Sequence, residues 1–367
     1  MKRIWLSLSF FILTGCTAGG SAALTSTAPP APLLTFTTAP TVASVPVSAA
    51  DEFAFAQNER LGRGVNFGNA LEAPTEGEWG MVIEAPFFDL VKQAGFNAVR
   101  VPTRWTAHAG MEPPYAVDPA FFERVDWVVA QALERDLVVV LNLHHFDGDI
   151  YEAPSQHKER FLAIWKQISE HYADQPDGLY FELFNEPYGS FSTTSAWNTM
   201  AAEAVQIVRN TNPKRIIIVG PGQWNSYREL YGLQLPENDR NLIVTFHYYE
   251  PFHFTHQGAE WAEGSEAWMG TTWTATKTEM FEVERAFAQV RKWADTARRP
   301  IFMGEFGAYS KADLESRARW TDFVAREAEK QGFSWAYWEF GAGFGVYDRE
   351  KQAWNEEIRK ALIPSTK

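Results

Sequence analysis

The sequence predicts a (β/α)8 barrel, also called a TIM barrel. Between residues 51 and 363, short apolar segments typical of buried strands alternate with longer amphipathic segments typical of helices. The alternation repeats eight times over about 310 residues, which suits the length and element order of this barrel. No internal repeat or central break points to a second domain. We therefore expect one domain over residues 51–363.

The fourth strand is the best-marked element. Tyr180, Phe181 and Leu183 are large and apolar, as a strand buried on both faces requires. Pro187 cannot donate a ladder hydrogen bond, so we expect the strand to end there. This places Asn185 and Glu186 at the carboxyl end of the strand, where parallel barrels carry their chemistry.

The other elements follow in chain order. The expected strands are 64–68, 98–102, 138–144, 179–186, 215–220, 242–249, 300–306 and 333–340. The expected helices are 86–94, 119–135, 155–172, 194–210, a short piece at 227–231, 276–296, 312–330 and 353–362.

The charge and composition restrict the class of ligand. The formal net charge is −13, which argues against nucleic acid because nucleic-acid binding calls for a basic face. The chain has 15 tryptophans, whose rings pack in cores and also stack on sugars. We expect a neutral polysaccharide or oligosaccharide substrate and a monomer.

The first 50 residues differ in composition from the rest. Residues 1–15 combine a basic start with a short apolar run, which is typical of a signal peptide. Leu13-Thr14-Gly15-Cys16 resembles a bacterial lipobox, and Cys16 is the single cysteine, so no intrachain disulfide is possible. The resemblance implies lipidation of Cys16, with a plain secretory signal as the alternative.

The segment 16–50 reads as a tether. It carries no charge and is dense in Ala, Thr, Pro and Ser, a composition that cannot bury a core. Thr17 follows the cysteine where an Asp would signal inner-membrane retention, so the resemblance favours the outer membrane. We expect export across the inner membrane and contact with a membrane only through the lipid at Cys16.

Polar side chains gather at the carboxyl ends of the expected strands. They are Asn69, Glu72, Arg100, His144, His145, Asn185, Glu186, His247, Tyr249, Glu305 and Trp338. The carboxylates of Glu186 and Glu305 belong to strands four and seven, which face each other across a barrel. We expect them to approach to roughly 5 Å, the separation that retaining glycoside hydrolysis needs. Structural ion pairing of each Glu is the alternative.

The pair His144 and His145 admits a metal site with Asp147 and His247. Neighbouring strand residues point to opposite faces, so both rings cannot easily bind one ion unless the strand has ended. We expect no metal or other cofactor: one ring orients a carboxylate and the other touches substrate. An inward Arg100 is expected beside Glu305, where it keeps the carboxylate ionised.

The segment after the sixth strand is long and aromatic. It contains His256 and Trp261 and continues through Trp268 and Trp273. With two further loop tryptophans, Trp79 and Trp224, this segment favours a carbohydrate groove, although each ring alone is as typical of packing.

Seven motifs carry a family resemblance. In order they are Arg63-Gly64-Val65-Asn66-Phe67-Gly68-Asn69, Asn97-Ala98-Val99-Arg100-Val101-Pro102, Leu143-His144-His145, Phe184-Asn185-Glu186-Pro187, Thr245-Phe246-His247-Tyr248-Tyr249, Gly304-Glu305-Phe306-Gly307 and Trp335-Ala336-Tyr337-Trp338-Glu339-Phe340. Together they resemble glycoside hydrolase family 5, the cellulase family, and most closely its bacterial endo-β-1,4-glucanases. The resemblance covers about residues 55–363.

The resemblance implies a role for each matching residue. Glu186 is the general acid/base with a raised pKa, and Glu305 is the nucleophile with a low one. Arg100 and Tyr249 hold Glu305, and Asn185 bonds the sugar 2-hydroxyl. Trp338 is the floor of the sugar site, and a cis peptide is implied after it. The residues implied to contact sugar or position substrate are Asn69, Glu72, His144, His145, His247, His256, Trp261 and Trp338.

Other functions stay open on the same scaffold. A β-mannanase, a mixed-linkage glucanase or a xyloglucanase differs from a cellulase at loop positions that no motif determines. A non-catalytic glycan-binding surface lipoprotein would keep the barrel without the chemistry. A metal-dependent hydrolase is a third class. No cellulose-binding module is visible, which favours soluble or partly degraded glucans.

Overall fold

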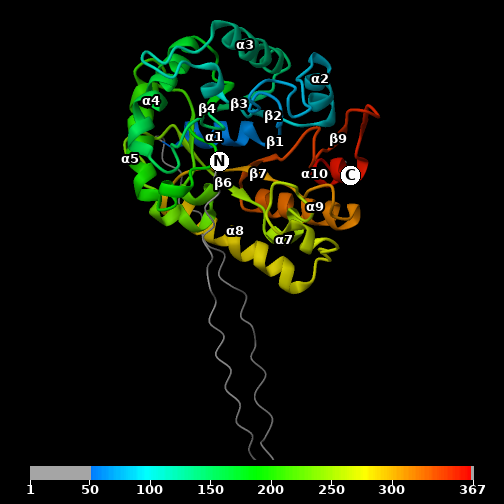
Figure 1. Ribbon diagram of the computed structural model, residues 1–367. Helices are drawn as coiled ribbons and strands as arrows, with labels where there is room; N and C mark the ends of the chain where they lie inside the picture. Colours follow the sequence, from blue (N-terminus) through cyan, green and yellow to red (C-terminus); the bar gives the residue numbers. More distant parts are fainter. Residues whose placement is uncertain (1–50, 365–367) are drawn as a thin grey trace, which may run out of the picture. The chain divides into compact units, whose positions relative to one another are not determined.

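The computed structural model describes residues 51–364; the predicted signal peptide, Cys16 and the tether lie outside them. Eight parallel strands close into a barrel in the order β1 to β8, which confirms the predicted fold (Figure 1). The barrel strands are β1 Arg63–Asn66, β2 Ala98–Val101, β3 Val138–Asn142, β4 Leu179–Glu182, β5 Ile217–Val219, β6 Leu242–Tyr248, β7 Ile301–Phe306 and β8 Ser334–Tyr337.

Helices surround the barrel, and their amphipathic sequences account for this position because one face packs on the strands (Figure 1). The longer helices are α1 Glu52–Leu61, α2 Ala85–Ala94, α3 Pro119–Leu133, α4 Pro154–His171, α5 Thr194–Arg209, α8 Lys277–Ala297, α9 Leu314–Lys330 and α10 Glu356–Leu362. Short helical pieces lie in the loops: η1 Trp105–His108, η2 Gly189–Phe191, α6 Gly222–Asn225, η3 Tyr227–Gly232, α7 Phe252–Thr255 and η4 Ser265–Trp268.

The apolar core has two parts. Residues that point outward from the strands pack against the surrounding helices in one large buried cluster. Inward residues such as Val140, Tyr180 and Ile218 fill the barrel, where Ala54 and Leu61 of α1 join them. Full burial of one such large apolar side chain stabilises the fold by about 1.5–3 kcal/mol. α1 therefore covers one end of the barrel interior and leaves the carboxyl ends of the strands open for a site.

Four strands end two or more residues earlier than predicted. β1 ends at Asn66, β3 at Asn142, β4 at Glu182 and β8 at Tyr337. Beyond β3 the backbone bends toward other partners: the N–H of His144 donates to the Thr103 carbonyl at 2.8 Å. β4 ends at Glu182, before Pro187, although the Asn185 N–H still donates to the Leu143 carbonyl at 3.0 Å. The polar groups of strands three, four and eight consequently lie in short loops above the barrel.

The last helix also begins later than predicted. Residues expected as its first turn form the strand β10 (Ala353–Trp354), which pairs antiparallel with β9 (Tyr347–Asp348). α10 starts at Glu356 because the Asn355 side chain caps it, accepting a hydrogen bond from the N–H of Ile358 at 3.4 Å.

Among residues 51–364, no helix has both the length and the apolar character needed to cross a bilayer.

Candidate active site

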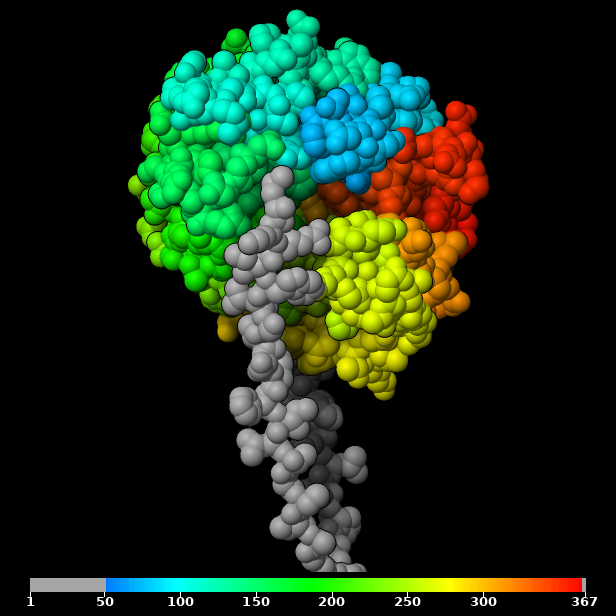
Figure 2. All heavy atoms as spheres, viewed as in Figure 1, coloured from blue at the N-terminus to red at the C-terminus, as the bar shows by residue number. Residues whose placement is uncertain are grey.

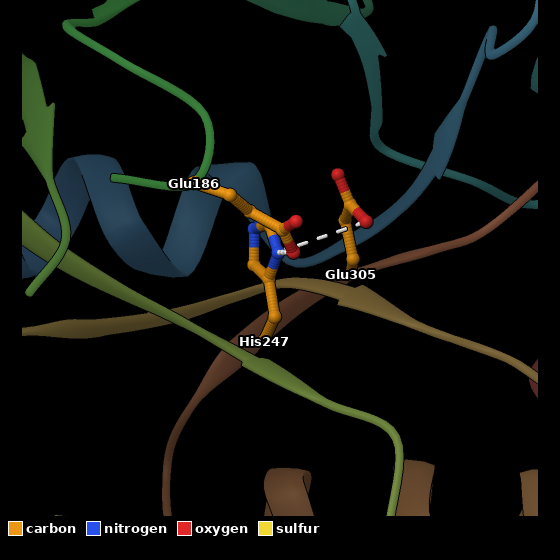
Figure 3. Close-up of side chains that lie close together, drawn as sticks. All are labelled: Glu186, His247 and Glu305. Carbon is orange, nitrogen blue, oxygen red and sulfur yellow. Dashed lines mark hydrogen bonds and ion pairs between the residues drawn. The ribbon is translucent and has the colours of Figure 1, made fainter. Parts of the chain in front are cut away.

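Two carboxylates and one imidazole meet at the mouth of the barrel (Figure 3). His247 Nδ1 lies 2.6 Å from Glu186 Oε1 and 3.6 Å from Glu305 Oε2. The contacting oxygens of the two carboxylates and the ring nitrogen all lie within 4.8 Å of one another. The structure therefore brings together the two glutamates that the sequence placed on opposite strands.

Glu305 reaches the mouth because of an irregularity in β7. Phe302 belongs to the barrel interior and Met303 to the outer cluster, so simple alternation would point Gly304 inward and Glu305 outward. The register with β6 shifts between Phe246 and His247, so that His247 pairs with Glu305. Such a bulge re-aims a side chain, and here it turns the Glu305 carboxylate into the barrel mouth.

Arg100 organises the floor of the site. Its guanidinium is fully buried and donates two hydrogen bonds to Glu182, at 2.6 and 2.8 Å, and one to Glu305 Oε1 at 2.8 Å. It also donates to Asn185 Oδ1 at 2.6 Å and to Asn66 Oδ1 at 2.8 Å. Burial alone would lower the pKa of Arg100, but the ion pairs with Glu182 and then Glu305 raise it. The guanidinium is therefore a permanent positive charge that pairs with both Glu182 and Glu305.

Glu182 was missed by the sequence prediction. It is fully buried and bonded to Arg100 through both carboxylate oxygens. A signal was present: Tyr180 points inward, and the residue two positions later on a strand points the same way. An acidic residue at an inward position requires a cation inside the barrel.

The pKa of Glu186 suits a proton donor. Burial at the mouth raises this pKa to about 8, the charge of Arg100 opposes the rise, and Glu182 adds to it. The side chain keeps 26% of its surface exposed, so a ligand can reach the carboxyl. At neutral pH Glu186 is thus largely protonated.

The pKa of Glu305 does not follow the prediction. Burial raises it above the ordinary value, although His247, Arg100 and a hydrogen bond from Tyr249 all act to lower it. The Tyr249 hydroxyl donates to Glu305 Oε2 at 2.9 Å. The expected low pKa is therefore wrong, because desolvation outweighs the charged and hydrogen-bonding neighbours.

Asn185 lies beside these carboxylates with one polar atom unused. Its Oδ1 accepts from Arg100, which turns its Nδ2 away from the guanidinium. Nδ2 makes no hydrogen bond within residues 51–364 and remains a donor for a ligand hydroxyl.

Neither of the two adjacent histidines orients a carboxylate, although one of them was expected to. His144 Nδ1 lies 3.1 Å from Asn142 Nδ2, and its ring stacks on Trp338 with centroids 5.6 Å apart. The His145 ring contacts Trp79 edge-on at 5.8 Å. The imidazole that reaches a carboxylate is His247, because β3 ends before the pair and both rings turn to aromatic neighbours. The peptide after Trp338 is cis, as the resemblance implied.

Glu72 is turned away from the expected sugar contacts. Its side chain is buried, with one oxygen accepting from the backbone N–H of Asn69 and the other from that of Ala70 at 2.9 Å. The Asn69 Nδ2 donates to Glu339, another buried acid that the sequence prediction treated only as part of a motif. Burial raises the pKa of Glu72 to about 8 and that of Glu339 to about 7.

The aromatic loop after β6 divides into packing and exposed rings. Trp273 is fully buried and so belongs to the core, which corrects its expected place in the groove. His256 stacks on Phe252 at 4.0 Å, whereas Trp261 is 63% exposed and meets Tyr309 edge-on at 4.9 Å. Figure 2 shows this segment in yellow at the surface, below the red segment that contains β9 and β10.

The predicted alternative metal set is not assembled. Asp147 bonds Arg104 and Thr106, and His144 and His145 have the partners described above. Among residues 51–364, Glu186, His247 and Glu305 form the one group with the spacing of a metal site. His247 Nδ1 already contacts an oxygen of each glutamate, along the dashed lines in Figure 3.

Known proteins resemble this chain in sequence and in fold. The family described as Cellulase (glycosyl hydrolase family 5) matches residues 62–343. The Endoglucanase H of Acetivibrio thermocellus is 39% identical over 316 residues, which cover 84% of this chain and 33% of that protein. The chain thus spans about a third of the length of this curated relative.

Solved structures of endoglucanases are also similar to this chain in sequence and fold. Thermotoga maritima Cel5A in complex with cellobiose is 50% identical with a TM-score of 0.83, and the match covers 84% of this chain and all of that one. Cel5A in complex with mannotriose is also 50% identical, with a TM-score of 0.82 and the same coverage. This chain belongs to glycosyl hydrolase family 5, the cellulase family.

Proposed function

We propose that this protein is an endo-acting β-1,4-glucanase that retains the configuration of the anomeric carbon. The observation that carries the proposal is the closeness of Glu186 and Glu305, since one carboxyl oxygen of each lies within 4.8 Å of the other. Retaining enzymes hold their two carboxyl groups about 5–5.5 Å apart, whereas inverting enzymes leave about 6.5–9.5 Å for a water.

The reaction is a double displacement. Glu186, protonated, donates its proton to the leaving oxygen while ionised Glu305 attacks the anomeric carbon and forms a glycosyl ester. Glu186, now ionised, then takes a proton from water, which breaks the ester and frees Glu305. Arg100 and Tyr249 hold the Glu305 carboxylate, and the unused Nδ2 of Asn185 donates to the sugar 2-hydroxyl.

The substrate class rests on the relatives and on the aromatic rim. Endoglucanase H supports a β-1,4-glucan, and the cellobiose complex of Cel5A agrees with it. The mannotriose complex of Cel5A favours a second candidate, hydrolysis of β-mannan at the same site. The exposed rings of Trp79, Trp224 and Trp261 offer stacking faces for sugars on either backbone.

The test compares reducing-sugar release from carboxymethyl cellulose, barley β-glucan, xyloglucan, glucomannan and xylan. We expect release from the β-1,4-glucans. Glu186→Gln and Glu305→Gln should each abolish it while the circular dichroism spectrum stays unchanged. Proton NMR of the first product should show the β-anomer. Early α-anomer or full activity in either variant would refute the mechanism, and polysaccharide binding without product would favour a glycan-binding protein.

We also propose that the enzyme is a monomer anchored to the outer membrane through lipid on Cys16. The lipobox-like Leu13-Thr14-Gly15-Cys16 and the uncharged tether support this. Cys16→Ala should move the protein from the membrane fraction to the soluble fraction of the expressing cell. An unchanged distribution would leave a plain secretory signal as the explanation.

A further inference from the structure

The loop after β5 holds an unusual backbone. Gln223, Trp224 and Asn225 all have positive φ, at 53°, 56° and 53°. Each left-handed residue other than glycine costs about 1–2 kcal/mol, so three in succession are retained only where the surroundings hold them. Trp224 donates its N–H to the Pro187 carbonyl at 3.1 Å, which ties this turn to the segment that carries Glu186.

The turn delivers the Asn225 side chain to the back of His247. Asn225 is completely buried, and its Nδ2 donates to the Asn185 carbonyl and lies 3.3 Å from His247 Nε2. Its Oδ1 makes no hydrogen bond within the described residues. A Cβ on Gly220 would stand 2.0 Å from this oxygen, so the glycine provides the space for it.

The Asn185 carbonyl determines which way the amide faces. If the Asn225 amide were reversed, its oxygen would point at a carbonyl oxygen and both acceptors would repel. The nitrogen must therefore face Asn185, and the same nitrogen then faces His247 Nε2. Because the amide nitrogen donates, Nε2 must accept, and a neutral imidazole carries its one proton on the other nitrogen.

We propose that Asn225 is a positioning residue that holds His247 in the tautomer with its proton on Nδ1. In this tautomer Nδ1 donates to Glu186 Oε1 across the 2.6 Å contact. The donor orients the carboxyl for proton transfer and stabilises it once it has given its proton away. Asn225 thus acts on Glu186 through His247 without touching substrate.

The charges that face His247 agree with a neutral ring. Burial lowers the pKa of His247 to about 4, Glu305 acts to raise it, Arg100 to lower it and Glu182 to raise it. Glu186 also faces Nδ1, and it is itself largely protonated at neutral pH. The neutral ring therefore carries one proton, on either Nδ1 or Nε2. We infer that Asn225 determines which of the two nitrogens carries it.

The direct test is NMR of the wild-type protein labelled with ¹⁵N-histidine, with His247→Gln to assign the ring. Long-range ¹H–¹⁵N correlations distinguish Nδ1 from Nε2, because Nε2 couples strongly to both ring C–H protons. We expect a protonated Nδ1 and an unprotonated Nε2. The opposite pattern would overturn the proposal without any Asn225 variant.

Asn225→Asp then tests the cause. The introduced carboxylate accepts from Nε2, so Nε2 should become protonated, either because the proton leaves Nδ1 or because the ring becomes an imidazolium. We expect kcat to fall about 10–100-fold, the effect typical of losing such an outer partner, with KM changing less than about threefold. An unchanged NMR pattern, or a wild-type kcat, would overturn the positioning role.

Asn212→Asp is the matched control. Asn212 is also buried and also donates its Nδ2 to a carbonyl, that of Ser169 in α4 at 2.6 Å, but it lies just before β5, at the amino ends of the strands rather than at the mouth. The Asn212→Asp protein should be less stable than the wild type. Its His247 ring should still be protonated on Nδ1 and unprotonated on Nε2, and its kcat should be unchanged. The effect on kcat rests on the proposed function, whereas the tautomer does not: a protein that releases no sugar but protonates Nδ1 would refute only the function.

Discussion

At the scale of single residues, Arg100 determines the electrostatics of the mouth. It neutralises Glu182 inside the barrel and donates to Glu305 and Asn185 at its rim. A buried ion pair offers little net stability over apolar residues, but losing one partner is costly because the other charge remains. The arrangement is thus better explained by function: it holds the Glu305 carboxyl and the Asn185 amide in fixed orientations at the mouth.

Arg100→Lys should damage both stability and catalysis. Lysine cannot reproduce the planar fork, so Glu182 and Asn185 lose hydrogen bonds in a buried site. We expect the free energy of unfolding to fall by about 1–3 kcal/mol and kcat/KM by about 100-fold. Urea unfolding and steady-state kinetics measure the two.

Arg359→Lys provides the control, since Arg359 pairs with Glu356 on the surface of α10. It should change stability by less than about 0.5 kcal/mol. Equal losses in both variants would show that burial of the Arg100 pair has no particular importance.

The pKa of Glu186 predicts the alkaline limb of the activity profile. The acid must be protonated to donate, and its pKa is about 8. Above that pH, kcat/KM should fall about tenfold per pH unit, while below the pKa of Glu305 it should fall because the nucleophile gains a proton. Initial rates on barley β-glucan from pH 4 to 10 check this, with assays at pH 6.5 after preincubation to exclude denaturation. A rate that stays flat to pH 10 would remove Glu186 as the donor.

At the scale of elements, the bulge in β7 matters most. It places Gly304 beside His247 and turns Glu305 inward. A Cβ on Gly304 would lie 2.7 Å from Thr245 Oγ1 and 3.1 Å from His247 Nε2, and Thr245 is completely buried. The glycine is therefore needed for space, not for an unusual φ.

Gly304→Ala should displace the His247 ring. We expect a loss of about 1–3 kcal/mol in stability from overpacking and at least about tenfold in kcat/KM. Gly110→Ala is the control, because its Cβ would come no closer than 3.6 Å to another atom. Thermal unfolding and steady-state kinetics of both variants test this prediction. Wild-type kinetics for Gly304→Ala would mean that catalysis tolerates the displacement of the His247 ring.

At the scale of the whole molecule, buried acids make stability depend on pH. Glu72 and Glu339 have pKa values of about 8 and 7 in the fold, against about 4.5 in an exposed chain. Because their folded pKa is raised, the fold binds their protons more tightly than the unfolded chain does. Their contribution is fully present below pH 4.5 and is lost as the pH rises toward 8.

Glu72→Gln isolates one of these contributions. The wild type should lose up to about 1.4 kcal/mol of unfolding free energy per pH unit for this group between pH 5 and 8. The variant cannot titrate there, so its stability should fall less steeply. Urea unfolding at pH 5, 6.5 and 8 gives both slopes, and parallel slopes would show that Glu72 titrates normally.

Local sequence and chain order were enough to predict the architecture and the two reacting carboxyl groups. Eight alternating apolar segments predicted the barrel, and the motif positions brought Glu186 and Glu305 to one mouth. Strand periodicity suffices to predict the barrel, and the common edge of parallel strands suffices to place both residues at its mouth, because these are properties of local sequence and chain order.

The orientation of these side chains depends on contacts between residues that are far apart in the chain. Simple alternation would have turned Glu305 out of the barrel, and only the pairing of β6 with β7 creates the bulge that turns it in. Glu72 turned to backbone N–H groups, and Asn225 reached His247 through a left-handed turn. These orientations depend on which distant atoms leave space or offer a hydrogen bond, and no local pattern in the sequence encodes that.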